Sequence, residues 1–145
     1  MAHETAALPS GADLAGWVRD ARQRTTALLA DLSDEQVVGP RLSTVNPLLW
    51  ELGHIAWFQE KWVLRRAGAA PLQAEADADA WYDPAVVPHA SRWDVPLPGR
   101  AAVTAYAEQV RDQVVRVVEQ GLSPADAYFV LLALFYEDLL GELLL

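Results

Sequence analysis

The residue with the clearest potential for chemistry in this chain is a histidine within an apolar, tryptophan-rich stretch. His54 has Trp50 four positions before it, and Trp57 and Phe58 three and four positions after it. On a helix, side chains at these spacings share one face, so the imidazole is expected to point inward among aromatic rings. Such an imidazole either ligates a metal or cofactor or is a hydrogen-bonded core residue. The residues alone favour the core interpretation.

The carboxylates give weaker signals. Glu51 and His54 form half of the Glu-x-x-His pattern found in di-iron carboxylate bundles, and the pattern occurs once. Glu137 and Asp138 lie beside the inward positions of their helix, so both are expected on its solvated face. No pair of carboxylates is therefore predicted to act as an acid and base.

The composition excludes several other kinds of site. The 145 residues include no cysteine, which excludes disulfides, thiolate ligands and iron–sulfur clusters. The sequence has none of the motifs of nucleotide-binding loops or of the common hydrolases. The two other histidines, His3 near the N-terminus and His89 in a proline-rich stretch, are expected in surface or loop positions.

Charge and hydropathy narrow the choice of partners. The net charge of −9 predicts no binding to nucleic acid and no attraction to an anionic membrane. The sequence shows no secretory signal and no apolar run long enough to cross a bilayer, so a cytoplasmic protein is expected. Hydrophobic residues make up 52% of the chain, enough for a sizeable core.

Start and stop signals predict four long helices. Ser10 with Asp13 has the pattern of a capping box, and Asn46 precedes Pro47 as a cap before a proline at the first helical position. A second capping pattern at Ser33 predicts a short additional helix. The long helices are expected over about residues 10–32, 46–66, 99–120 and 123–145. The last is apolar almost all round and is expected to be the most buried.

A segment of about thirty residues, 69–98, separates the second and third long helices. It holds five of the nine prolines together with Trp81, Tyr82 and Trp93, which indicates an ordered crossover packed on the bundle. The sequence therefore predicts one all-α domain over residues 1–145, with a flexible segment at 1–9. Its architecture is a four-helix bundle with a long crossover.

Three segments resemble a known family. NPLLWELGHIAWFQEKWVLR (46–65), DAWYDPAVVPHASRWDVPLPGR (79–100) and YFVLLALFYEDLLGELLL (128–145) are similar to blocks of one domain. It is the DinB-like N-terminal domain of ergothioneine sulfoxide synthases (hercynine oxygenases) and selenoneine synthases. The Trp-Asp-x-Pro-Leu-Pro crossover resembles the selenoneine synthases more closely.

The resemblance implies a non-haem Fe(II) site held by three histidines. His54 matches the histidine of the Leu-Gly-His helix, and the other two belong to a His-Glu-x-x-His pair on the last helix. That pair maps onto Tyr136 and Leu140, with Glu137 between them. Leucine cannot ligate, and a phenolate suits Fe(III) better than an imidazole-held Fe(II), so the inherited site is expected to be incomplete.

The family also continues into a C-terminal domain that resembles the formylglycine-generating enzyme. This chain stops at Leu145, so sulfur or selenium transfer is not expected from it alone. The leading hypothesis is a DinB-like bundle without its iron site, which acts as a binding or scaffold domain. A small molecule or cofactor would occupy a core pocket lined by Trp50, His54, Trp57, Phe58, Tyr136 and Leu140.

Two other hypotheses remain open from the sequence. In one, His54 anchors a haem or another metal, in a catalyst that is natural or engineered. In the other, the chain is a fragment of a non-haem iron oxygenase that forms C–S or C–Se bonds with a missing domain. If His54 binds nothing, it is expected to form a hydrogen bond with Tyr136 across the core. Self-association is left open by the apolar C-terminal residues.

Overall fold

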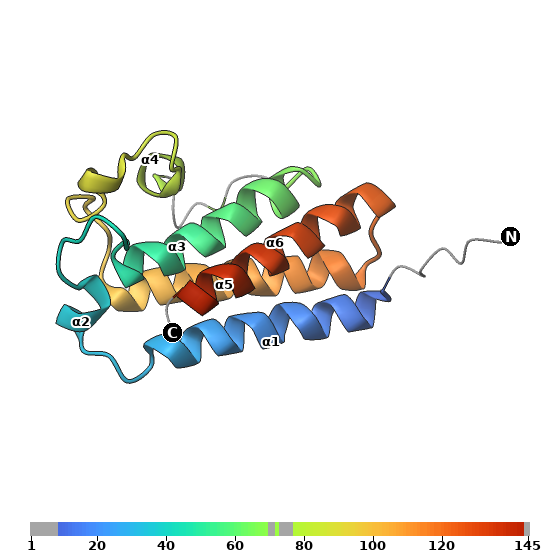
Figure 1. Ribbon diagram of the computed structural model, residues 1–145. Coiled ribbons are helices and arrows are strands. Elements are labelled where there is room, and N and C mark those ends of the chain that lie inside the picture. The colour runs from blue at the N-terminus through green and yellow to red at the C-terminus, as the bar shows by residue number, and fades with distance from the viewer. Residues whose placement is uncertain (1–8, 70–71, 73–76, 144–145) are drawn as a thin grey trace, which may run out of the picture.

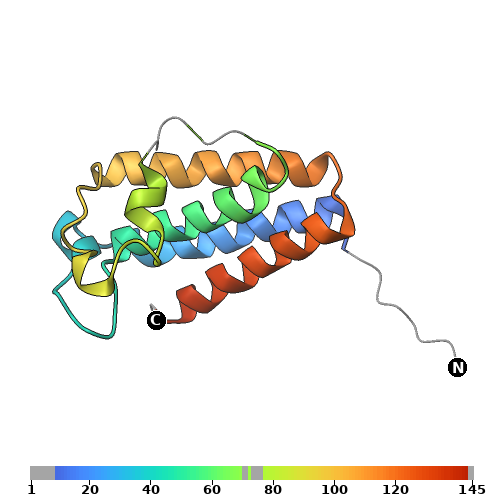
Figure 2. The same cartoon turned by 90° about the horizontal axis from the view of Figure 1, so that it is seen from above.

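A computed structural model of the protein describes residues 9–69, 72 and 77–143, and helices are the only regular elements in these ranges. The four long helices are α1 (Gly11–Leu29), α3 (Leu48–Gln59), α5 (Arg100–Glu119) and α6 (Pro124–Leu143). They lie side by side as a bundle (Figures 1 and 2), which confirms the predicted all-α architecture. His3 and the rest of segment 1–8 lie outside the described residues.

Shorter elements gather mainly at one end of the bundle. They are α2 (Asp34–Val38), α4 (Ala78–Tyr82) and a 3-10 turn (His89–Ser91). Figure 2 shows α2 and the crossover at this end, with α4 beside α3. None of the helices in the described ranges is long and apolar enough to span a membrane.

Side-chain capping explains where α1 and α2 begin. The predicted capping box is present at α1, where the Ser10 hydroxyl accepts from the Asp13 amide and the Asp13 carboxylate accepts from the Ser10 amide. The box at Ser33 is also formed and starts α2. At α3 the expected cap is wrong, because Pro47 is the N-cap residue and the Asn46 side chain instead bonds to Glu51. The amide oxygen of Asn46, which could accept from a backbone N–H at the start of α3, accepts from Arg92 at 2.8 Å instead.

The second long helix does not stay α-helical to its end. After α3 the chain continues into a π-helical turn, η1 (Glu60–Arg65), which holds one residue more per turn than expected from an α-helix. Glu60, which opens it, is fully buried, and the Tyr106 hydroxyl of α5 donates to its carboxylate at 2.6 Å. The wide turn thus joins α3 to α5 through a buried hydrogen bond.

The burial of the helices corrects one expectation. The prediction that the last helix is the most buried is wrong, because α3 has ten buried residues among its twelve, whereas five residues of α6 are buried. Helix α3 packs on α2, α4, α5 and α6, while α6 packs on α1, α3 and η1. The outer face of α6 therefore stays open to solvent although its residues are apolar.

The crossover packs closely on α3 at Gly53. A Cβ atom on Gly53 would lie 2.2 Å from the ring of Tyr82, so only glycine lets this ring approach the helix. The indole of Trp50 donates to the carbonyl of Trp81 at 2.7 Å, and the indole of Trp57 donates to Asp79 at the same distance. The described part of the crossover, Leu72 and residues 77–98, is ordered against the bundle as predicted.

Candidate functional site

His54 lies at the centre of the candidate site, with hydrogen bonds at both ring nitrogens. It is 2% exposed. Its Nδ1 lies 2.8 Å from the Tyr82 carbonyl, and its Nε2 lies 2.6 Å from the Tyr136 hydroxyl. A carbonyl only accepts, so Nδ1 carries the proton and Nε2 of the neutral ring accepts from Tyr136. The α3 histidine and the α6 tyrosine are therefore joined directly.

Aromatic rings surround this pair. Trp50 stacks on His54 with centroids 4.8 Å apart, and Trp57 lies 5.7 Å away on the same helix. Phe58 stacks on Tyr136 at 4.6 Å. Trp50, His54, Trp57 and Phe58 thus share one face of α3 as their helical spacing predicts, and Tyr136 of α6 contacts His54 and Phe58. Leu140, also predicted for this site, follows one turn along α6 and is half-buried.

The electrostatics of the pair favour its neutral form. Burial lowers the pKa of His54 to about 4, so the ring is uncharged at neutral pH. Burial raises the pKa of Tyr136, and the nearby Glu51 carboxyl raises it further. Burial likewise raises the pKa of Glu51.

Arg92, which the sequence analysis missed, connects the crossover to this cluster. Its guanidinium lies over the Trp50 ring at 4.3 Å and donates to Asn46 at 2.8 Å. Asn46 in turn donates to one oxygen of Glu51. The other oxygen of Glu51 is buried with no hydrogen-bond partner among the described residues. No spacing rule links position 92 to position 50, so only the fold reveals the contact.

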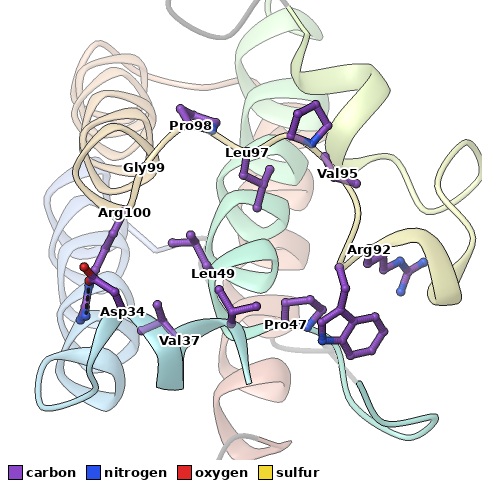
Figure 3. Close-up of a pocket in the computed structure, with 13 residues that line it drawn as sticks. Asp34, Val37, Pro47, Leu49, Arg92, Val95, Leu97, Pro98, Gly99 and Arg100 are labelled. Carbon is purple, nitrogen blue, oxygen red and sulfur yellow. Dashed lines mark ion pairs between the residues drawn. The ribbon is translucent and has the colours of Figure 1, made fainter. Parts of the chain in front are cut away.

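A cavity of about 370 Å³ lies beside Arg92, between α3 and the end of the crossover. Figure 3 shows Val37, Leu49, Leu97 and Pro98 around it, with the Asp34–Arg100 ion pair at one side. Apolar side chains and prolines therefore make up most of its wall. Arg92 separates this cavity from the rings around His54.

A second polar cluster is buried between α1, α3, α5 and α6. The Arg22 guanidinium donates to Glu137 at 2.7 Å and to Gln59 at 2.9 Å, and it also donates to the Ala107 carbonyl. Thr25 donates to Glu137 at 3.3 Å. The expectation that Glu137 lies on a solvated face is wrong, because this carboxylate is 1% exposed. Asp138 is exposed as predicted and pairs with Arg24.

Sequence reasoning missed this cluster although a signal was present. Arg22 lies four residues after Val18 and three before Thr25, on the apolar stripe of the first helix. A charged residue at a core position requires a buried partner of opposite charge. That requirement points to an inward carboxylate, which the fold supplies with Glu137.

The donor set beside His54 does not fit the three-imidazole Fe(II) centre that the resemblance implies. Tyr136 and Leu140 offer a phenol and a hydrocarbon at the other two positions, and His54 Nε2 already accepts from the phenol. Within the described ranges there is no group of three or more His, Cys, Asp or Glu side chains that could hold a metal ion.

The architecture defines the class of protein. It is an all-α bundle of four long helices whose second and last helices meet at the buried His54. The sequence profile of the DinB superfamily matches residues 18–134, and the chain belongs to this superfamily.

Among characterised proteins, the chain is similar to hercynine oxygenase from Mycolicibacterium thermoresistibile. The two are 32% identical over 123 residues. The aligned region covers 84% of this chain and 27% of that protein, so the chain spans about a quarter of its relative's length. The expected resemblance to the hercynine oxygenases is thereby confirmed.

Proposed function

We propose that this DinB domain is a binding or scaffold domain in which the His54 site has ceased to be an iron centre. The observation that carries the proposal is the 2.6 Å contact between His54 Nε2 and the Tyr136 hydroxyl. A metal ion on this nitrogen would have to displace the phenol, and the neighbouring Leu140 would offer it no donor. One imidazole then remains where the family uses three.

The cavity beside Arg92 supports a binding role. Its volume of about 370 Å³ falls within the range of small-molecule sites, roughly 300–1,000 Å³. Three prolines line it, Pro47, Pro96 and Pro98, and fixed backbone angles keep such a wall in place before a ligand arrives. The expected ligand is a small molecule with a mainly apolar body.

Metal binding tests the loss of the iron centre. We expect the purified protein to hold far less than one iron per chain and to bind Fe(II) weakly in anaerobic titrations. The double variant Tyr136→His/Leu140→His restores three imidazoles and should bind Fe(II) at one per chain. The matched control, Tyr136→Phe/Leu140→Phe, introduces rings without nitrogen ligands and should not.

Two results would overturn this part of the proposal. One is wild-type protein with about one metal ion per chain that is lost in His54→Ala. The other is a haem Soret band in the purified protein that disappears with the same substitution. Either would show that His54 is a working ligand.

Cavity filling tests the binding role. Leu97→Trp should weaken binding of an apolar fluorescent probe, anilinonaphthalene sulfonate, by about tenfold or more, because the larger ring occupies the cavity. Val86→Trp places the same ring at an exposed crossover position that does not line the cavity, and it should leave probe binding unchanged. Equal binding to both variants and the wild type would contradict a ligand site in this cavity.

A further inference from the structure

Helix α6 presents an apolar stripe that nothing in the described structure covers. Its members are exposed by 37% to 70%, and they are Tyr128, Leu132, Phe135, Leu139 and Leu143. They follow one another at intervals of four, three, four and four residues. Intervals of three and four residues keep side chains on one face of a helix, along which a second helix can pack. We name these five residues the α6 seam.

We propose that the α6 seam is the contact surface of a symmetric dimer, in which α6 of one chain packs antiparallel on α6 of a second copy. The proposal concerns a surface separate from the His54 site and does not depend on the proposed function. The following observations carry it.

The α6 seam has two large apolar residues on each side of the central Phe135. When two copies run antiparallel about a two-fold axis that passes between Phe135 and Tyr136, Tyr128 comes level with Leu143 of the second copy, and Leu132 comes level with Leu139. Every seam residue thus meets another large apolar residue. A two-fold dimer requires a surface that is complementary to itself, and the α6 seam meets that requirement.

The charges on α6 favour the antiparallel orientation. Residues 127–136 carry no charge, whereas Asp138 and Glu142 border the seam in its C-terminal half. An antiparallel pair places these carboxylates beside the uncharged half of the second copy, where the exposed Tyr128 hydroxyl can donate to Glu142. A parallel pair would place Asp138 beside Asp138 and Glu142 beside Glu142. Like charges so close together destabilise a helix pair.

A surface depression lies beside Phe135, the central residue of the α6 seam. This depression of about 520 Å³ lies between α1 and α6, and its lining combines four large apolar side chains with three charged ones: Trp17, Leu131, Leu134 and Phe135, and Asp20, Arg24 and Asp138. Trp17 is 49% exposed here. Phe135 of the second copy would reach this hollow from across the two-fold axis and bury its ring against Trp17.

The exposed area is sufficient for a specific dimer. With roughly 200 Å² for a full large side chain, the seam and Trp17 expose on the order of 600 Å² per copy. A standard interface buries about 800 Å² per partner, and further atoms bordering the seam would add to the total. The surface therefore matches a dimer of moderate affinity.

The first measurement is the mass of the protein in solution by light scattering during gel filtration. We expect twice the chain mass of 15.9 kDa at micromolar concentrations. Phe135→Glu should raise the dissociation constant at least about 100-fold, because it places two like charges at the centre of the interface. Val86→Glu is the matched control, since Val86 is similarly exposed on the crossover, and it should remain dimeric.

A cross-linking experiment tests the orientation, and the absence of native cysteine makes it clean. Phe135→Cys places a thiol from each copy beside the two-fold axis, so mild oxidation should yield a covalent dimer. Tyr128→Cys places the thiols at opposite ends of the seam and should not cross-link. Circular dichroism of the Phe135 variants checks that the helices are retained.

Three results would overturn the proposal. A monomeric wild type at the highest soluble concentration would show that another molecule or nothing covers the seam. A dimer that survives Phe135→Glu would place the interface elsewhere. Cross-linking at position 128 as efficient as that at position 135 would indicate a parallel pair.

Discussion

Two neighbouring residues of α6, Tyr136 and Glu137, enter two polar clusters of opposite character. Glu137 joins Arg22, Gln59 and Thr25 in a charged network whose members are each at most 3% exposed. Tyr136 joins His54 in a neutral pair at the less buried edge between α3 and α6. One helix thus contributes to both clusters within a single turn.

This difference indicates which buried polar residues can be substituted at the smaller cost in stability. Arg22 and Glu137 are buried as an ion pair, so a substitution that removes either charge leaves the other buried without its charge partner. The His54–Tyr136 pair carries no charge and is bounded mainly by aromatic rings. Substitution at the His54–Tyr136 pair should therefore cost the fold less than substitution of Arg22 or Glu137.

The largest effect is expected in the charged network. Glu137→Ala leaves the Arg22 guanidinium buried without its carboxylate and should lower the free energy of unfolding by about 3–5 kcal/mol. Urea denaturation followed by circular dichroism measures it. The double variant Arg22→Met/Glu137→Leu removes both charges and should be more stable than Glu137→Ala. If the two variants are equally unstable, the cost does not come from the unpaired charge.

The second-largest effect is expected at Gly53, which lets Tyr82, a hydrogen-bond partner of His54, pack closely on α3. Gly53→Ala forces the Tyr82 ring away from α3, and it moves the carbonyl to which His54 Nδ1 donates. We expect a loss of about 3 kcal/mol in thermal or urea unfolding. Gly16→Ala is the control, because its Cβ would meet no atom within 4 Å on the exposed side of α1. It should stabilise the protein by about 0.5–1 kcal/mol, and equal effects at both glycines would contradict the close approach.

The protonation of His54 should make the stability of the protein fall in acid. The pKa of His54 falls from the ordinary 6.5 to about 4 on folding, so the unfolded chain binds the extra proton first. The stability that depends on the neutral ring is complete above pH 6.5 and is lost as the pH falls toward 4. Between pH 7 and pH 5 this loss amounts to about 2 kcal/mol. His54→Gln should flatten the pH dependence of unfolding in this window, and an unchanged slope would contradict a neutral buried ring.

The smallest effect is expected at the hydroxyl of Tyr136. Tyr136→Phe removes the donor to His54 Nε2 and keeps the ring stacked on Phe58, so we expect a loss of about 1 kcal/mol. Urea unfolding measures it beside Tyr128→Phe, whose hydroxyl lies on the exposed face of α6. A loss as large as that of Glu137→Ala would remove the contrast between the clusters.

Local signals explain how much of the fold could be predicted from the sequence. The capping boxes at Ser10 and Ser33 act within four residues, and the helices begin where these patterns place them. The ring spacing around His54 is also local, so the grouping of Trp50 and Trp57 with it needs no knowledge of the other helices. These features depend on the chain's own geometry.

The remainder depends on neighbours that are distant in sequence. Because α6 is apolar almost all round, its residues show no contrast between an inner and an outer face, and the direction of Glu137 could not be predicted from them. That direction is determined by Arg22, which lies 115 positions earlier in the chain. The contact of Arg92 with Trp50 likewise arises only when the crossover folds back over α3.

The π-helical turn at Glu60–Arg65 has a consequence for how this chain can vary in length. A π-turn is the helical counterpart of a one-residue insertion, because the extra residue is absorbed within a single wide turn. Removal of one residue there would restore an ordinary α-turn, and the inward face that carries His54 would keep its register. The second long helix therefore contains a built-in site where homologues can gain or lose a residue without rotating their functional side chains.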